Sequence, residues 1–354
     1  MKKLYVTIGA VLLVLAIGAY FFLSAIFSGP LYLTGSLKSE AAYAHLLKEA
    51  PDQGKENYFQ LNDDISLYYT TQGSGKPVLI VHGGPGIPYD QHWAGLDSLG
   101  QEYRYYYYHQ RGCGNSSRPF DKFPTSNFYE NMKSLNEHLG LPAQIADIEQ
   151  LRRILKQDKI VLMGHSFGGF IASLYALEFP ERVEALVLIT PAEVLKMPSD
   201  GDGLYGVVEK KLPEEYVEEY RSYMERVFDY SKLFEMSEEE LVVQNKEFIR
   251  FYNLATNNSA TGEVKGIGGW IQNACFLSMG MKHDYSEALR NIKAPTLLMH
   301  GKEDLIPLSS LQLYRENIPH AELIEIEGAG HFPFVEKPRL FSNAIAGFFE
   351  KYGI

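Results

Sequence analysis

KIVLMGHSFGGFIASLYALE, residues 159–178, is the stretch of the sequence that says most about the fold. It begins as an apolar run, passes through a serine flanked by glycines and continues with helical spacing. This order predicts a buried strand, a tight turn and a helix, with the Ser166 hydroxyl exposed on the turn. Gly164 and Gly168 leave room around that turn, and the N-terminus of the helix favours negative charge beside it. We therefore predict that Ser166 is a nucleophile.

The alternation of short apolar runs and helical stretches continues on both sides of this segment. Several runs are unbroken, as expected for parallel strands that helices cover on both faces. The expected strands are 56–61, 65–71, 77–81, 103–109, 160–163, 185–189, 296–299 and 322–326. The expected helices are 143–156, 169–177, 308–317 and 339–352. The pattern predicts an α/β fold, a mostly parallel sheet flanked by helices with right-handed crossovers.

The alternation stops between about residues 192 and 290. Helical periodicity is clear there in EEYVEEYRSYMERVF (214–228) and EEELVVQNKEFIRFYN (238–253), and no strand pattern is visible. The block is too long for a loop, and the sheet pattern resumes at Ala294, which argues against a separate C-terminal domain. We expect a helical cap over 192–291 inserted into a core of 57–191 and 292–354.

A nucleophilic serine needs a histidine base and a carboxylate that orients it. In a strand–serine–helix arrangement of this kind the chain order is serine, acid, histidine. His331 lies in GAGHFPF after the last expected strand, and Asp304 lies in HGKEDLIP after strand 296–299. Glu303 is the alternative acid, but the spacing from Gly301 and the nearby proline favour Asp304. The predicted triad is Ser166, Asp304 and His331.

A tetrahedral intermediate also needs hydrogen-bond donors for its oxyanion. One donor should be the backbone N–H of Phe167, the residue after the serine. The second should come from HGGPG (82–86), which follows the apolar run PVLIV. Glycines there allow the backbone to approach a substrate closely, and Gly84 is the predicted donor.

Several motifs together resemble the proline iminopeptidase family of α/β-hydrolases. They are HGGPG (82–86), HQRGCGNSS (109–117), ADIEQLRRIL (146–155) before GHSFGG, then GKED (301–304) and GAGHF (328–332). The resemblance covers roughly residues 57–352 and implies an α/β-hydrolase fold with an inserted cap. It also implies release of an N-terminal residue, often proline, from a peptide or arylamide, with no metal or organic cofactor. A carboxylesterase acting on small esters and a non-catalytic binding module on the same fold are the alternatives.

The sequence departs from the family where substrate binding is concerned. His109 and Phe167 stand where the family usually has other residues, and Trp270 lacks the neighbouring glutamate that the family's cap often carries. Cap glutamates commonly hold the free α-amine of the substrate in this family. This cap offers many candidates, and the substrate-binding residues stay unassigned: Glu214, Glu215, Glu218, Glu219, Glu239 and Glu247.

The composition narrows the range of partners. The formal net charge of -11 argues against nucleic acid. The two cysteines, Cys113 and Cys275, form neither a disulfide framework nor a metal site by spacing. The resemblance to proline iminopeptidases implies a peptide or other small molecule as the substrate.

The N-terminus predicts membrane attachment. No charged residue occurs from Leu4 to Ser36, and as a helix the apolar core 4–27 would span about 36 Å, enough for a bilayer. Lys2 and Lys3 favour a cytoplasmic N-terminus. We expect a signal anchor over 1–28, a tether over 29–56 and a catalytic domain outside the cell membrane. A cleaved signal peptide and a secreted enzyme are the alternative.

Overall fold

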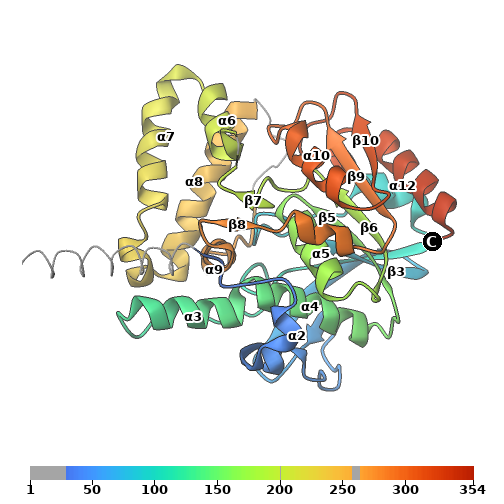
Figure 1. Cartoon of the computed structure of the whole chain (residues 1–354), viewed down its shortest axis with the longest axis horizontal. Helices are drawn as coiled ribbons and strands as arrows, with labels where there is room; N and C mark the ends of the chain where they lie inside the picture. The colour runs from blue at the N-terminus through green and yellow to red at the C-terminus, as the bar shows by residue number, and fades with distance from the viewer. Residues whose placement is uncertain (1–28, 200, 257–263) are drawn as a thin grey trace, which may run out of the picture.

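The computed structural model describes residues 29–199, 201–256 and 264–354. Within these residues an eight-stranded sheet runs in the order β1-β2-β4-β3-β5-β6-β9-β10 (Figure 1). The pairs β1–β2 and β2–β4 are antiparallel, and the other neighbours are parallel. The strands are β1 Tyr58–Gln60, β2 Ser66–Gly73, β3 Lys76–Val81, β4 Tyr103–Tyr108, β5 Ile160–His165, β6 Val183–Ile189, β9 Thr296–Gly301 and β10 Glu322–Ile326. The expected mostly parallel sheet is confirmed, strand by strand.

The apolar strands bury both of their faces, because alternate residues point to opposite sides of a sheet. In β5, Ile160 and Leu162 belong to one core cluster, and Val161 and Met163 belong to another. The first cluster includes residues of α4 (Leu141–Ile154) and α5 (Phe167–Glu178), and the second includes residues of η2 (Ala94–Leu99) and α12 (Pro338–Tyr352). Each fully buried aliphatic side chain contributes about 1.5–3 kcal/mol, so these strands hold the turn that carries Ser166 rigidly.

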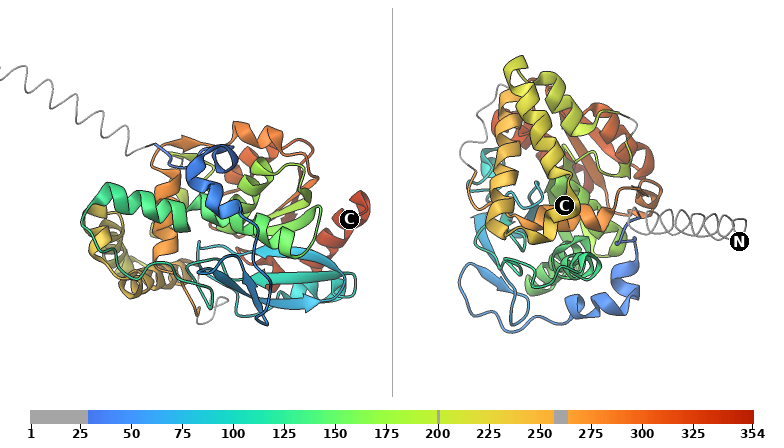
Figure 2. Two further views of the ribbon diagram at one scale, coloured as in Figure 1. Left: turned by 90° about the horizontal axis from the view of Figure 1, so that it is seen from below. Right: turned by 90° about the vertical axis from the view of Figure 1, so that its left-hand side faces the viewer.

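The chain between β6 and β9 is mainly helical. Its helices α7 and α8 coincide with the two periodic stretches of the sequence, and the cap lies at the opposite end of the molecule from the C-terminus (Figures 1 and 2). Phe251 of α8 packs with Tyr220 and Tyr223 of α7 in a small apolar cluster. The elements are β7 Lys196–Met197, α6 Gly203–Lys211, α7 Glu214–Val227, η3 Tyr230–Glu235, α8 Glu238–Thr256, α9 Trp270–Met279, β8 His283–Asp284 and η4 Glu287–Asn291.

The remaining elements complete the layers around the sheet. They are α2 Ser36–Ser39, η1 Ala41–Leu47, α3 Phe128–Leu139, α10 Leu308–Asn317 and α11 Pro333–Glu336. The helix α3 has no counterpart among the helices expected from the sequence. It packs against α9 and α4, and so it connects the helical insertion to the core.

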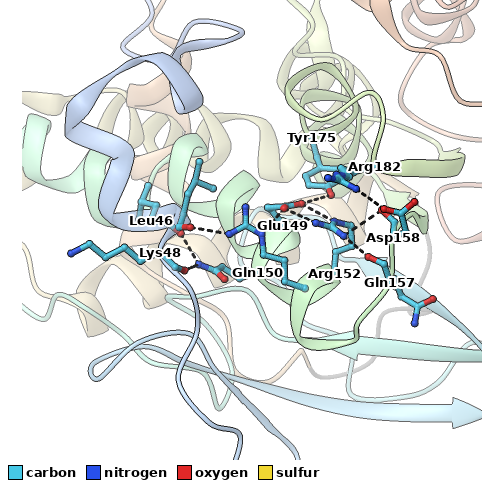
Figure 3. A network of polar contacts seen from close by, with 11 residues as sticks. Leu46, Lys48, Glu149, Gln150, Arg152, Gln157, Asp158, Tyr175 and Arg182 are labelled. Carbon is cyan, nitrogen blue, oxygen red and sulfur yellow. Dashed lines mark hydrogen bonds and ion pairs between the residues drawn. The ribbon is translucent and has the colours of Figure 1, made fainter.

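Two motifs of the sequence turn out to meet inside the core. Arg111 of HQRGCGNSS donates through Nε to Asp147 of ADIEQLRRIL over 2.8 Å, and both side chains are buried. In the same helix α4, the Glu149 carboxylate accepts hydrogen bonds from Arg152 and from the hydroxyl of Tyr175 in α5 (Figure 3). These motifs therefore fix how α4 sits against its neighbours.

The segment expected as a tether lies against the core. Tyr32 donates its hydroxyl proton to Glu178 over 2.7 Å. Gln150 of α4 donates through Nε2 to the carbonyls of Leu46 and Lys48 (Figure 3). The segment contributes four side chains to the buried apolar set: Tyr32, Leu37, Tyr43 and Leu46.

The signal anchor expected over residues 1–28 lies outside the residues that the structure describes. Among residues 29–199, 201–256 and 264–354, no helix combines the length and apolar character needed to cross a bilayer.

Candidate active site

Ser166 stands on a sharp turn between β5 and α5. Its backbone has φ 54° and ψ −125°, a conformation that costs free energy for a residue with a side chain. The flanking glycines make the turn possible, because a Cβ on Gly168 would lie 2.1 Å from the Val81 carbonyl oxygen. A Cβ on Gly164 would lie 2.5 Å from the carbonyl oxygen of Gly168. The turn presents Ser166 to a large cavity.

His331 and Asp304 come together at the same edge of the sheet. Asp304 follows β9 and His331 follows β10, and the distance from His331 Nδ1 to Asp304 Oδ2 is 2.8 Å. The Asp304 side chain has no exposed area, and its other oxygen accepts the N–H of Ile306 over 3.1 Å. Glu303, the alternative acid, is exposed to solvent. The carboxylate paired with the histidine is therefore that of Asp304.

His331 and Ser166 line the same cavity. Among the described residues, no direct hydrogen bond joins the Ser166 hydroxyl to the His331 ring, which uses its Nδ1 for Asp304. The Nε2 atom thus remains available to the serine. In enzymes of this kind such contacts often tighten only when the substrate is bound.

The loop that carries His331 is held from two sides. The carboxylate of Glu336 accepts the N–H of Gly330 over 2.6 Å and that of Phe332 over 2.9 Å. On the other side, His165 Nε2 donates to the carbonyl oxygen of His331 over 2.7 Å. These bonds hold the backbone at Gly330, at His331 itself and at Phe332.

His165, the residue before the serine, is buried and neutral. Burial, reinforced by the neighbouring His331, lowers the pKa of His165 well below its usual value. Its Nδ1 accepts a hydrogen bond from the Tyr89 hydroxyl over 2.6 Å, which fixes the tautomer that donates to His331. The turn of Ser166 and the loop of His331 are thereby connected through one side chain.

Two backbone regions beside Ser166 contain the predicted oxyanion donors. Phe167 begins α5, where the N–H has no carbonyl of an earlier helical turn to bind. Gly84, the other predicted donor, lines the cavity, but Gly83 lies closer to the serine. A Cβ on Gly83 would lie 2.8 Å from the Ser166 Cβ. Sequence reasoning left Gly83 out, although the glycine pair in HGGPG offered both.

His82 shapes this loop. Its Nδ1 donates to the carbonyl oxygen of Gly83 over 3.0 Å, and its Nε2 accepts the N–H of Gln110 over 3.0 Å. Burial lowers the pKa of His82 to about 3, so the ring stays neutral at physiological pH. The HGGPG and HQRGCGNSS motifs are therefore joined beside the serine.

The cavity has a volume of about 1430 Å³ and lies between the sheet and the cap. Its walls include Ser166, Phe167, Gly84 and His331, while Asp304 lies behind the histidine. From the cap, Tyr252 of α8 reaches over the site, with its ring 6.1 Å from that of His331. Residues of the cap thus form part of the wall of the cavity that Ser166 lines.

The cap glutamates considered from the sequence do not line this cavity. Glu219 pairs with Arg250 and Glu247 pairs with Arg226 on the outer surface. Three carboxylates do line the cavity, those of Asp90, Asp202 and Glu193, and Glu193 lies four residues after the end of β6. Its Oε2 atom is buried without a hydrogen-bond partner among the described residues. Burial, and then the charge of Asp202, raises the pKa of Glu193.

Sequence reasoning missed Glu193, because an acid next to an apolar run reads as a strand end. The signal that could have found it is its place at the carboxyl end of a parallel strand, where ligands bind in such sheets. The backbone N–H of its neighbour Ala192 donates to the carbonyl oxygen of Ser166 over 3.0 Å, which ties this segment to the serine turn.

The sheet, the serine turn and the Asp304–His331 pair define an α/β hydrolase. Residues 76–338 match the family described as alpha/beta hydrolase fold, and the chain belongs to that family. The proline iminopeptidase of Saccharolobus solfataricus is 26% identical, over 85% of this chain and 93% of that protein. This relative confirms the resemblance to proline iminopeptidases.

Solved structures share the fold at lower sequence identity. A thermophilic esterase from Thermogutta terrifontis has a TM-score of 0.56 and 22% identity, covering 86% of this chain and 100% of the esterase. The proline iminopeptidase of Mycobacterium smegmatis has a TM-score of 0.55 and 16% identity, covering 82% and 96%. One fold thus carries both peptidase and esterase neighbours of this chain.

Proposed function

We propose that this protein is a serine hydrolase of proline iminopeptidase type, which releases N-terminal residues from peptides through an acyl-enzyme on Ser166. The observation that carries the proposal is the strained serine turn facing the same cavity as the His331–Asp304 pair. A non-catalytic binding module would have no use for backbone strain at this residue.

The geometry supports a two-step reaction. The Ser166 hydroxyl oxygen attacks the scissile carbonyl carbon while its proton passes to His331 Nε2. Asp304 holds the imidazole and stabilises its charged form. The N–H of Phe167 and one from the Gly83–Gly84 pair receive the developing oxyanion. The C–N bond then breaks as His331 returns the proton to the leaving amine, and water releases the acyl group by the same route.

Glu193 is the observation that favours a peptidase over an esterase. A carboxylate oxygen buried without a partner is costly unless a cation joins it. The free α-ammonium of a peptide's first residue supplies that cation in the cavity that Ser166 faces, whereas a simple ester has no group for it. The carboxylesterase stays the second candidate, because the same triad serves both reactions.

The experiment compares proline, alanine and leucine arylamides with free and acetylated amines, beside short-chain aryl esters. The proposal predicts turnover of the free-amine arylamides, proline first, and little turnover of the acetylated ones. Glu193→Gln should raise KM for free-amine substrates by about tenfold, a loss of roughly 1.4 kcal/mol, while Glu239→Gln on the outer surface serves as the control. Turnover that is equal with free and acetylated amines would favour the esterase instead.

The pH dependence gives a second readout. Because the pKa of Glu193 is raised, its carboxylate takes up a proton at a higher pH than an ordinary glutamate does. KM for free-amine substrates should therefore rise as the pH falls through that raised pKa. The Glu193→Gln variant should lose this dependence.

We also propose that a signal anchor over residues 1–28 holds the protein in the cell membrane, with the catalytic domain on the extracytoplasmic side. The support for this proposal is the charge-free stretch from Leu4 to Ser36 behind Lys2 and Lys3. The intact protein should stay with membranes through a carbonate wash. Mass spectrometry of the mature chain tests this, because an N-terminus between residues 19 and 31 would mean a secreted enzyme.

A further inference from the structure

We propose that the substrate carries an apolar chain longer than a single amino-acid side chain, bound in the cavity beside Ser166. The inference rests on the proposed serine hydrolase activity, but it holds for either a peptidase or an esterase. The inference concerns the part of the substrate that fills the cavity. It does not depend on whether the bond that is cleaved is an amide or an ester.

The first observation is size. Pockets that hold drug-sized molecules measure roughly 300–1,000 Å³. The cavity at Ser166 measures about 1430 Å³, so one terminal residue and its scissile bond leave most of it empty. Apolar walls left in contact with water are unfavourable, and a ligand that covers them gains free energy.

The second observation is the character of the walls. Aromatic and aliphatic side chains from three separate helices line the cavity. They are Phe128 and Met132 of α3, Phe248 of α8, and Phe276 and Leu277 of α9. A flexible apolar chain is the ligand that such walls favour, since each methylene buried there adds to binding.

The third observation is the entrance. Three large apolar residues that line the cavity are also exposed to solvent: Phe228 (46%), Met281 (58%) and Val335 (51%). They belong to different parts of the chain, after α7, after α9 and in α11. Polar residues of the lining are exposed as well: Asp90, Gln91, His92, Asp202 and Lys265. Apolar side chains exposed where a cavity reaches the surface give an apolar ligand a place to bind. The apolar walls of the cavity therefore continue to the surface at these three residues, Phe228, Met281 and Val335.

Alkyl fluorophosphonates of increasing chain length test this without knowledge of the natural substrate. The Ser166 oxygen forms a bond to phosphorus, the P–F bond breaks, fluoride leaves and the serine proton passes to His331. Burial of a methylene favours binding by up to about fourfold. We expect the second-order rate of Ser166 modification to rise at least tenfold between a butyl and a decyl probe.

Variants at the entrance connect the effect to this cavity. Met281→Glu and Phe228→Glu should lower the decyl rate about tenfold more than the butyl rate. Val243→Glu and Leu340→Glu are matched controls, because these side chains are 62% and 47% exposed but do not line the cavity. The controls should leave the ratio of the two rates unchanged.

A measurement on the unmodified enzyme guards against variants that fail to fold. Micromolar 1-decanol should protect Ser166 from the butyl probe, and 1-butanol at the same concentration should not. The decyl probe is presented both as monomer and in phosphatidylcholine vesicles. Faster modification of Ser166 from vesicles would indicate that the enzyme takes its apolar substrate from a bilayer. Faster modification by the monomeric probe would indicate that it takes the substrate from solution.

The outcomes separate the two proposals. Modification of Ser166 by the butyl probe at a rate that is flat or falls with chain length overturns the apolar chain and leaves the serine hydrolase standing. Failure of every probe to modify Ser166 overturns both. If the rate of modification rises with alkyl length but the entrance variants do not change that rise, the alkyl chain binds outside this cavity. That result also contradicts the inference.

Discussion

The residue next to Ser166 in space is as constrained as the serine itself. Gly83 approaches the serine so closely that any side chain would push one of them away, and the neighbouring Gly84 has φ +112°. Displacements of about 1 Å at a reacting group can cost a factor of 10² in rate. A side chain at Gly83 would thus displace the turn that carries Ser166.

We expect Gly83→Ala to lower kcat about a hundredfold with the fold intact, because its Cβ would come within 2.8 Å of the Ser166 Cβ. Gly54→Ala is the matched control, since a Cβ there would meet nothing within 4 Å. Steady-state kinetics and circular dichroism of both variants measure the effect. Equal kcat in the two variants would show that Gly83 does not position the serine.

Site residues could be predicted from the sequence where their role depends on nearby residues in the chain. Ser166, Asp304 and His331 could be selected because each follows a strand and the chain order is fixed by the fold. Gly83 and Glu193 could not, because their importance depends on which atoms of distant segments lie beside them. Their catalytic roles remain predictions for the experiments above.

At the scale of elements, the strands were the most predictable part. Fully buried parallel strands need continuous apolar runs, and such runs are visible without the structure. The helix α3 was missed although Phe128, Met132, Leu135 and Leu139 recur at helical spacing within a mostly polar sequence. The signal that could have found it is Asn127, whose side chain caps the helix by accepting the N–H of Glu130.

The packed segment after residue 28 makes a prediction about truncation. Deleting 1–28 should leave a stable, active enzyme, whereas deleting 1–50 should lower Tm by about 5 °C or more. The longer deletion removes Tyr32, Leu37, Tyr43 and Leu46, each worth about 1.5–3 kcal/mol of burial before the entropy of ordering the segment is subtracted. Calorimetry decides, and equal Tm values would show that the segment adds no stability.

For the whole molecule, buried neutral histidines set how the fold responds to acid. Burial lowers the pKa of His109 to about 4 and that of His82 to about 3. In the unfolded chain each would titrate near 6.5. Between these values the unfolded state binds more protons, so stability is complete above about pH 6.5 and decreases as the pH falls toward 4.

His109→Gln should flatten this dependence, because it removes one of the two titrating groups, and His109 is not among the residues that line the cavity. Between pH 6.5 and about 4.5, the free energy of unfolding of the parent should fall faster than that of the variant, by up to about 1.4 kcal/mol per pH unit. Urea titrations at a series of pH values measure both slopes. Parallel curves would contradict a neutral His109 in the folded protein.

The strands and the helical insertion could be anticipated from the sequence, but the order of the strands in the sheet and the cavity could not. Strands and insertion follow from patterns along the chain, whereas the strand order and a volume of about 1430 Å³ depend on how distant segments pack together. Substrate choice is determined at that scale, which is why the motifs alone left the substrate-binding residues open.

The most direct test of a Ser166 nucleophile is covalent modification followed by peptide mass spectrometry. A fluorophosphonate should add to the peptide containing Ser166 in a 1:1 ratio with loss of activity. Ser166→Ala should abolish both labelling and turnover while its circular dichroism and Tm stay like those of the parent. Labelling that persists in Ser166→Ala, or a parent enzyme that is active but unlabelled at Ser166, would contradict the assignment.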